Sequence, residues 1–215
     1  MSLENATQVL AIRHGETDWN RDTRIQGQLD IPLNQRGRAQ ARRLAAALAG
    51  EPLAAVYASD LARAWETAAA LQGLGAPIHA DARLRERSFG HFEGQTWDEI
   101  ARRWPEQSLR WRRRDPDFAA EGGESLSRFY ARCTDAVREL AQAHPGQTIA
   151  IVAHGGVMDC LYRLAARLEL HAARSWTLGN ASINRLIYSP EGFGLVGWND
   201  DQHLQDLGLD DLAQA

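Results

Sequence analysis

The octet RHGETDWN, residues 13–20, directly follows the short apolar run VLAI, residues 9–12. The run is short and continuous rather than alternating, which predicts a buried strand of a parallel sheet. Arg13 and His14 therefore stand where a strand ends, and reactive groups gather at the carboxyl ends of strands in open α/β sheets. Gly15 allows the backbone to approach a ligand closely. The stretch predicts a functional loop at one edge of a sheet.

Two other predicted strands also end in polar groups. The apolar run at 54–57 is followed by a helix that carries Arg63 in its first turn, and the run TIAIVA at 148–153 ends at His154. The carboxyl ends of parallel strands meet at one edge of a sheet. We therefore predict one pocket that holds Arg13, His14, Arg63 and His154.

This set of side chains suits a phosphoryl group. The planar guanidinium group of an arginine such as Arg13 or Arg63 can bind two phosphate oxygens at once. A neutral imidazole can attack phosphorus. Zinc is the competing interpretation of paired histidines, but no third ligand stands at metal-ligand spacing beside His14 or His154. Two histidines satisfied by backbone carbonyls in the core remain the simplest alternative, although Arg13 would then bury an unpaired charge. We predict no metal.

Alternating strand and helix patterns organise the rest of the chain. Helices are predicted at 35–49, 61–72, 125–143 and 157–168, with Ser59 or Asp60 capping the second, and further strands at 78–83, 181–188 and 195–198. This alternation predicts a three-layer α/β/α sandwich with a mostly parallel central sheet and helices on both faces. Residues 1–215 are expected to form a single domain.

An irregular stretch interrupts this pattern, and a small cap is predicted between Gly94 and Gly122. Trp97, Trp104 and Trp111 recur there at helical spacing. The simpler interpretation is that they are core contacts of the cap; the alternative is a lid whose aromatic faces line a substrate pocket. The arginines at 110 and 112–114 are interpreted as a solvated face, with an electrostatic funnel for anions as the alternative.

Composition excludes several classes of protein. The net charge of −4 and the pI near 6.0 provide no basic field for nucleic acid. No apolar run approaches the roughly 18 residues of a membrane span, and no signal peptide is recognised. Cys133 and Cys160 fall inside helical patterns and are expected to be reduced and buried, which favours a cytoplasmic location. The acidic tail from Asp200 is expected to be partly mobile, and the oligomeric state is left open.

Six ordered motifs together resemble the histidine phosphatase superfamily, in the branch that includes phosphoglycerate mutases and many small-molecule phosphatases. The motifs are RHGETDWN (13–20), QGQLDIPLNQRGRAQA (26–41), SDLARAWETA (59–68), LRERSFGHFEG (84–94), GGES (122–125) and AHGG (153–156). They cover most of the chain in the expected order. The shared fold of such proteins, one sheet with helices on both sides, agrees with the prediction above.

The resemblance implies a role for each matching residue. His14 would be the nucleophile that forms a phosphohistidine, its tautomer fixed by a backbone carbonyl, and Glu86 would donate a proton to the leaving group. Arg13, Arg63 and a protonated His154 would bind the phosphoryl group. Further substrate contacts are assigned to Asn20, Gln26, Gly27 and Gly155.

The implied activity is hydrolysis of a small-molecule phosphomonoester without cofactor or metal. A phosphoglycerate mutase-type transfer is the alternative, and the short segment from Gly94 to Gly122 favours the phosphatase. A non-catalytic phosphate-binding protein is expected to lack one of the four key residues, and all four are present: His14, Arg63, Glu86 and His154. The only expected partner is the phosphorylated small-molecule substrate.

Overall fold

The computed structural model describes residues 5–205 and residue 207. Within these residues one six-stranded sheet has the order β3-β2-β4-β1-β5-β6. The strands are β1 (Thr7–Arg13), β2 (Leu53–Ala58), β3 (Ile78–Ala80), β4 (Thr148–Ala153), β5 (Ile183–Ser189) and β6 (Gly192–Asp200). The pairs β1/β4, β2/β4 and β2/β3 are parallel, whereas β5 lies antiparallel to both β1 and β6. The mostly parallel sheet is confirmed.

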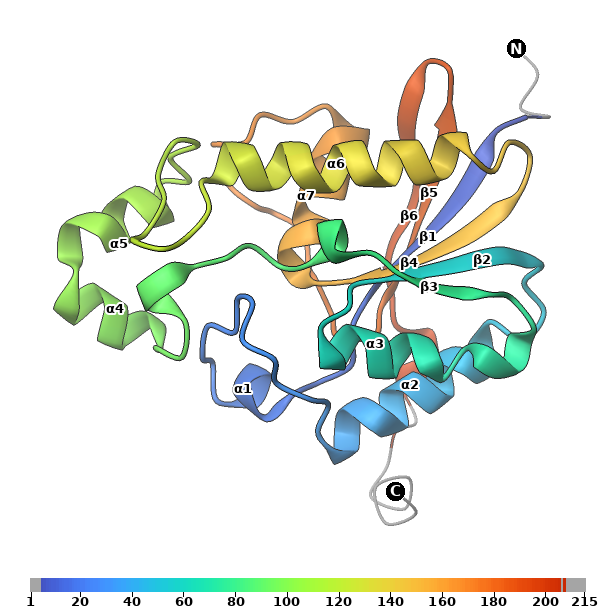
Figure 1. The fold of residues 1–215 in the computed structure, drawn as a ribbon, viewed down its shortest axis with the longest axis horizontal. Coiled ribbons are helices and arrows are strands. Elements are labelled where there is room, and N and C mark those ends of the chain that lie inside the picture. Colours follow the sequence, from blue (N-terminus) through green and yellow to red (C-terminus); the bar gives the residue numbers. More distant parts are fainter. Residues whose placement is uncertain (1–4, 206, 208–215) are drawn as a thin grey trace.

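Helices cover both faces of this sheet. They are α1 (Asp18–Arg21), α2 (Gln35–Ala47), α3 (Ala62–Ala69), α4 (Trp97–Arg103), α5 (Pro105–Arg112), α6 (Leu126–Gln142) and α7 (Gly155–Ala166). Alternate residues of β1 divide the core, because Val9 packs with residues of α6 and α7 whereas Leu10 packs with residues of α2 and α3. Figure 1 shows these helix pairs on opposite sides of the sheet. The three-layer sandwich is therefore confirmed.

The start of α3 differs from the prediction. Its N-cap is Leu61, whose side chain makes no capping hydrogen bond. Asp60 instead forms an ion pair with Arg85, at 2.6 and 2.7 Å. The hydroxyl of Ser59 bonds the ring of His154 at 2.8 Å. The predicted cap at Ser59 or Asp60 is wrong because both side chains have partners outside the helix.

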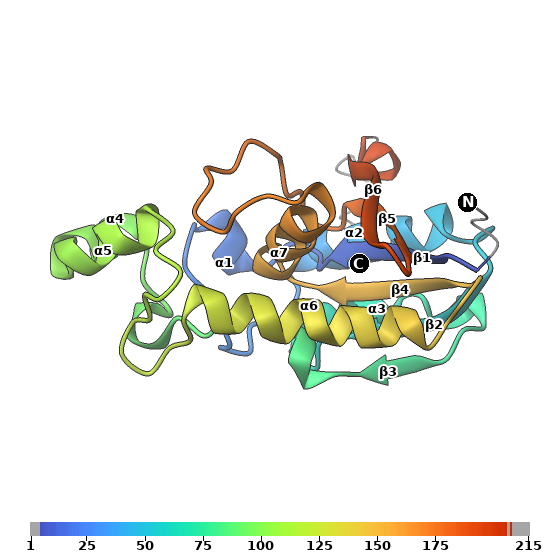
Figure 2. The same cartoon turned by 90° about the horizontal axis from the view of Figure 1, so that it is seen from above.

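The small cap segment predicted between Gly94 and Gly122 is present as α4 and α5, which project beyond one end of the sheet (Figures 1 and 2). A small apolar cluster of Phe92, Ile100, Phe118 and Ala120 holds it together, with Trp104 and Trp111 packed against it. Trp97 stacks on Trp111, with ring centroids 3.9 Å apart, but remains 41% exposed. Trp104 and Trp111 are thus core contacts of the projecting segment as predicted, whereas Trp97 is not.

One arginine ties the end of the cap to α7. Arg114 follows α5 with a φ of 54° and donates to Asp159 at 2.6 Å and to the Leu170 carbonyl at 2.8 Å. Asp159 also accepts from Arg163 at 3.0 Å. The arginine cluster therefore does not act as one solvated face: Arg110 pairs with Asp115 at the surface, whereas Arg114 is a structural bond between two parts of the fold.

Other expectations concern the termini and the cysteines. The tail follows β6 with a short turn in which His203 bonds the Ala181 carbonyl at 3.1 Å, and residues 206 and 208–215 of the predicted mobile tail lie outside the described residues. Cys133 and Cys160 are free and buried, as predicted. Among the described residues, no helix combines the length and apolarity that a membrane crossing requires.

Candidate active site

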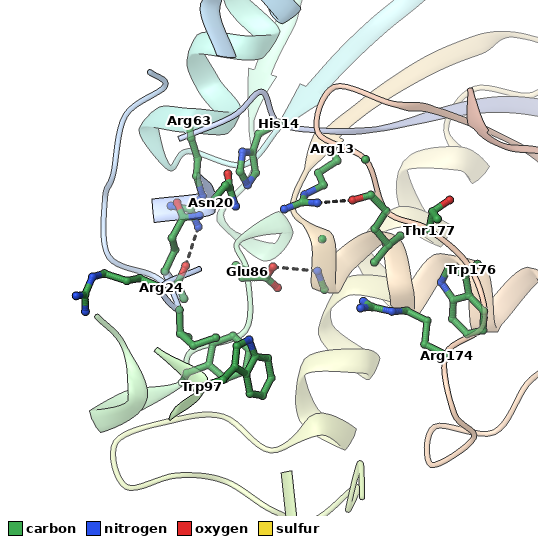
Figure 3. Close-up of a pocket in the computed structure, with 18 of the residues that line it drawn as sticks. Arg13, His14, Asn20, Arg24, Arg63, Glu86, Trp97, Arg174, Trp176 and Thr177 are labelled. Atoms are coloured by element: carbon green, nitrogen blue, oxygen red, sulfur yellow. Dashed lines mark hydrogen bonds between the residues drawn. The ribbon is translucent and has the colours of Figure 1, made fainter. Parts of the chain in front are cut away.

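A cavity of about 750 Å³ opens at the carboxyl ends of β1 and β4 (Figure 3). Its lining includes nearly all the predicted site residues: Arg13, His14, Asn20, Gln26, Gly27, Arg63, Glu86 and Gly155. His154 alone among them does not line it. The strand ends thus converge as the sequence predicts.

His14 presents one ring nitrogen for chemistry. Its Nδ1 lies 2.6 Å from the Gly15 carbonyl oxygen, and because a carbonyl only accepts, Nδ1 must donate. This bond fixes the tautomer and leaves Nε2 without a proton. Burial, and then the charges of Arg63 and Arg13, lower the pKa of His14 well below its ordinary value. The ring is therefore a neutral imidazole.

His154 lies behind the cavity wall rather than in it. Its ring is fully buried, and its centroid is 5.2 Å from that of His14. Nε2 bonds the Ser59 hydroxyl, while Nδ1 has no hydrogen-bond partner among the described residues. Burial, and then the charge of Arg63, lower its pKa well below the ordinary value. These surroundings favour the neutral ring, whereas the sequence-based expectation was a protonated His154.

Two buried guanidinium groups supply positive charge. Arg63 is 1% exposed and donates to the carbonyls of Gly27 at 2.7 Å and Leu29 at 2.9 Å. Burial lowers its pKa to about 10, so it remains charged at neutral pH. Arg13 donates to the Leu178 carbonyl, and burial lowers its pKa as well. The Nε–H of each arginine is buried without a partner in the described part of the chain.

The loop after β1 orients two amide side chains. Thr17 caps α1, and the Asn20 side-chain oxygen accepts from the Thr17 backbone N–H at 3.1 Å. The Gln26 side-chain oxygen accepts from the Thr17 hydroxyl at 3.0 Å. Because both oxygens are taken, the NH₂ groups are the polar groups that Asn20 and Gln26 have left for an anion. The substrate contacts assigned to Asn20 and Gln26 stay predictions.

Glu86 is held at the wall of the cavity by backbone groups. Its carboxylate oxygens accept from the N–H groups of Arg87 and Gly156, both at 2.9 Å. A Cβ on Gly156 would lie 2.2 Å from Glu86 Oε1, so only glycine permits this approach. Figure 3 shows the carboxylate across the cavity from His14. Glu86 is thus an acidic side chain held in a fixed position at the cavity wall.

Gly27 has a structural reason to be glycine. Its φ is +52°, and a Cβ there would lie 2.1 Å from Glu93 Oε1. Glu93 accepts from the backbone N–H groups of Gln28 and Phe89, at 3.0 and 2.9 Å. The loop that carries Gly27 is thereby fixed to the segment after Glu86, and Glu93 is a local hydrogen-bond partner.

Sequence reasoning missed several residues that line the cavity. Arg174, Trp176 and Thr177 come from the connection between α7 and β5, and Asn180 in the same segment donates to the His14 carbonyl at 3.0 Å. Neither helical nor strand periodicity runs through this connection, so no pattern indicated it. Trp97 and Trp111 also line the cavity, which supports the alternative interpretation of these two tryptophans as part of a lid.

The buried histidines predict a pH-dependent stability. Below the ordinary histidine pKa of 6.5 the unfolded chain takes up protons at positions 14 and 154, whereas the folded protein does not. The free energy of unfolding should therefore fall as the pH decreases from 7 to 5.5, by up to about 1.4 kcal/mol per pH unit for each histidine. Urea unfolding across this range measures the slope. The slope should be shallower in His14→Gln, and an unchanged slope would contradict the assignment.

Within the described residues, no three or more His, Cys, Asp and Glu side chains form a group that could hold a metal ion. The zinc interpretation of His14 and His154 therefore lacks a ligand set. The charge available to a phosphate in this cavity comes from arginines.

Comparisons with known proteins agree with this geometry. The family described as "Histidine phosphatase superfamily (branch 1)" matches residues 9–201. Two Arabidopsis thaliana proteins are similar: "Phosphoglycerate mutase-like protein 4", 36% identical over 94% of this chain and 89% of that protein, and "Metal-independent phosphoserine phosphatase", 34% identical over 94% and 85%. A mycobacterial glucosyl-3-phosphoglycerate phosphatase, solved with VO3, has a TM-score of 0.80 at 33% identity over 90% of this chain and 99% of that one. The chain belongs to the histidine phosphatase superfamily.

Proposed function

We propose that this protein hydrolyses small-molecule phosphomonoesters through a phosphohistidine on His14. The observation that carries the proposal is the state of the His14 ring: neutral, with Nδ1–H held by the Gly15 carbonyl and Nε2 beside two buried arginines. A nucleophile needs that free lone pair, and the transferring phosphoryl group needs that charge.

In the first step His14 Nε2 attacks phosphorus in line with the ester oxygen. The N–P bond forms as the P–O bond breaks, and the leaving oxygen takes a proton from Glu86. Arg13 and Arg63 stabilise the charge on the equatorial oxygens, which is the main contribution to phosphoryl transfer. The NH₂ groups of Asn20 and Gln26 are placed to add neutral donors.

In the second step water attacks the phosphohistidine. Glu86, now ionised, takes the proton from the water as the O–P bond forms and the P–N bond breaks. Orthophosphate leaves, His14 is again neutral, and Glu86 is again protonated. We assign His154 Nδ1, which is buried without a partner among the described residues, as a further contact for a phosphoryl oxygen.

The similar proteins support hydrolysis, but some are named as phosphatases and others as phosphoglycerate mutase-like proteins. Phosphoserine and glucosyl-3-phosphoglycerate phosphatases stand beside phosphoglycerate mutase-like proteins at similar identity. A mutase would pass the phosphoryl group to a second hydroxyl before water reaches it. The test must therefore measure both reactions.

A substrate panel tests the proposal. We expect the protein to release orthophosphate from aryl and alkyl phosphomonoesters, to leave phosphodiesters intact, and to isomerise 3-phosphoglycerate more slowly than it hydrolyses its best monoester. EDTA should change these rates less than twofold. Faster isomerisation than hydrolysis would favour the mutase, and inhibition by EDTA that one divalent metal reverses would reopen the zinc interpretation.

A further inference from the structure

The cavity around His14 continues into a second space. An adjoining cavity of about 470 Å³ shares several lining residues with it: Glu86, Phe89, Trp97, Trp111, Gly155, Gly156 and Arg174. Its other walls come from α6, α7 and the end of the cap. Glu86 stands at the junction of the two cavities. The leaving group of a phosphomonoester bound at His14 would therefore extend into the second one.

One wall of this second cavity is aromatic. Trp97 stacks on Trp111 at an interplanar angle of 19°, and Trp111 packs on Phe89 with centroids 5.2 Å apart. Leu126 and Phe129 continue the apolar lining from α6. Trp97 keeps 41% of its surface exposed although it lines both cavities. Such a face favours a planar, apolar group.

Four arginines surround the second cavity, and they divide into two kinds. Arg87 and Arg114 donate to backbone carbonyls and, in the case of Arg114, to Asp159. Arg112 and Arg174 make no hydrogen bond or ion pair with any other residue in the part of the chain that the structure describes. Two guanidinium groups therefore face this space without an internal partner.

The acidic groups nearby are already bonded. Asp159 accepts from Arg114 and Arg163, and Glu86 accepts from two backbone N–H groups. Asp201 lines only the first cavity. Figure 3 shows the Arg174 side chain pointing toward the space between Glu86 and Trp97. In the described part of the chain, these acidic groups therefore leave the charges of Arg112 and Arg174 without an acidic partner.

We propose that the second cavity is a leaving-group subsite for phosphomonoesters whose alcohol half has a planar, apolar body and a terminal anion such as a carboxylate. The body would lie on Trp97, and the anion would bind Arg174, with Arg112 as the second guanidinium. This inference rests on the proposed phosphatase function and names the substrate class of the same site.

A pair of substrates tests the role of Arg174. Biphenyl-4-yl phosphate and 4′-carboxybiphenyl-4-yl phosphate differ only in the terminal carboxylate. At low ionic strength the wild-type protein should prefer the carboxylated ester about tenfold in kcat/KM, as a charge-assisted hydrogen bond predicts. Arg174→Gln should bring this ratio close to one. Arg113→Gln removes an exposed charge of the cap that lines neither cavity, and it should keep the ratio.

A second pair of variants tests the aromatic face. Trp97→Ala should lower kcat/KM for biphenyl-4-yl phosphate relative to ethyl phosphate by about fivefold. Trp65→Ala on α3 is the matched control, because Trp65 is 40% exposed and lines neither cavity. Ratios that stay unchanged in Arg174→Gln and Trp97→Ala would overturn the subsite alone. Failure of the wild-type protein to hydrolyse any ester would overturn the proposed function and the subsite with it.

Discussion

His14→Ala should abolish turnover, with kcat/KM for an aryl phosphate falling by about 10⁴-fold or more, as expected when a nucleophile is removed. Among the described residues that line the cavity, His14 is the only histidine, and the bond from its Nδ1–H to the Gly15 carbonyl fixes its tautomer. The remaining arginines would still bind the phosphate. The variant should therefore bind orthophosphate while it has lost turnover, which equilibrium binding measures.

The matched control is His171→Ala, which removes an exposed imidazole from the connection after α7 and should keep full activity. Brief mixing of the wild-type protein with a ³²P-labelled ester, followed by an alkaline quench, should leave label on the chain, and His14→Ala should carry none. Full activity of His14→Ala, or label on that variant, would show that another residue is the nucleophile.

Glu86→Gln should slow the reaction by a factor that depends on the leaving group. An alkyl phosphate has a poor leaving group and needs the proton, so its kcat/KM should fall by about 10²–10⁴-fold. The leaving group of a dinitrophenyl phosphate is a stable dinitrophenolate that departs without a proton. For this ester kcat/KM should therefore fall by less than about tenfold. Plotting log kcat/KM against leaving-group pKa for the wild type and the variant gives the comparison.

Glu106→Gln on the exposed face of α5 is the matched control, and it should leave both substrates unaffected. The backbone bonds of Glu86 provide a second check. Because its two oxygens accept from Arg87 and Gly156, an amide keeps one of these bonds and loses the other. Equal losses for both leaving groups would mean that the side chain had only been displaced, and the role as proton donor would be wrong.

The strand ends explain why much of the site could be predicted. His14 and His154 each come at the end of an apolar strand. The parallel pairing of β1 with β4 places Arg13 opposite Ala153, so the two rings that follow lie together. The pairing of β4 with β2 places the start of α3, and therefore Arg63, beside them. These relations follow from local patterns and from the geometry of parallel sheets.

Other parts of the site depend on contacts that no local pattern encodes. Ser59 has the position of a helix cap, but its hydroxyl bonds a histidine from another strand. Trp97 and Trp104 share one helical periodicity, yet one lines the cavity and the other fills the cap, because periodicity shows a face but not what that face meets. Arg174 lies in an irregular connection whose path only the fold determines.

The bond between Arg114 and Asp159 has a consequence for how a substrate enters. Swinging α4 and α5 away would break a charge-assisted hydrogen bond worth about 1.5–3 kcal/mol and leave a nearly buried carboxylate with a single guanidinium. The entrance is thus built before the substrate arrives. We therefore expect substrate to enter without opening of α4 and α5, and kcat/KM for the best substrates should fall as solvent viscosity rises.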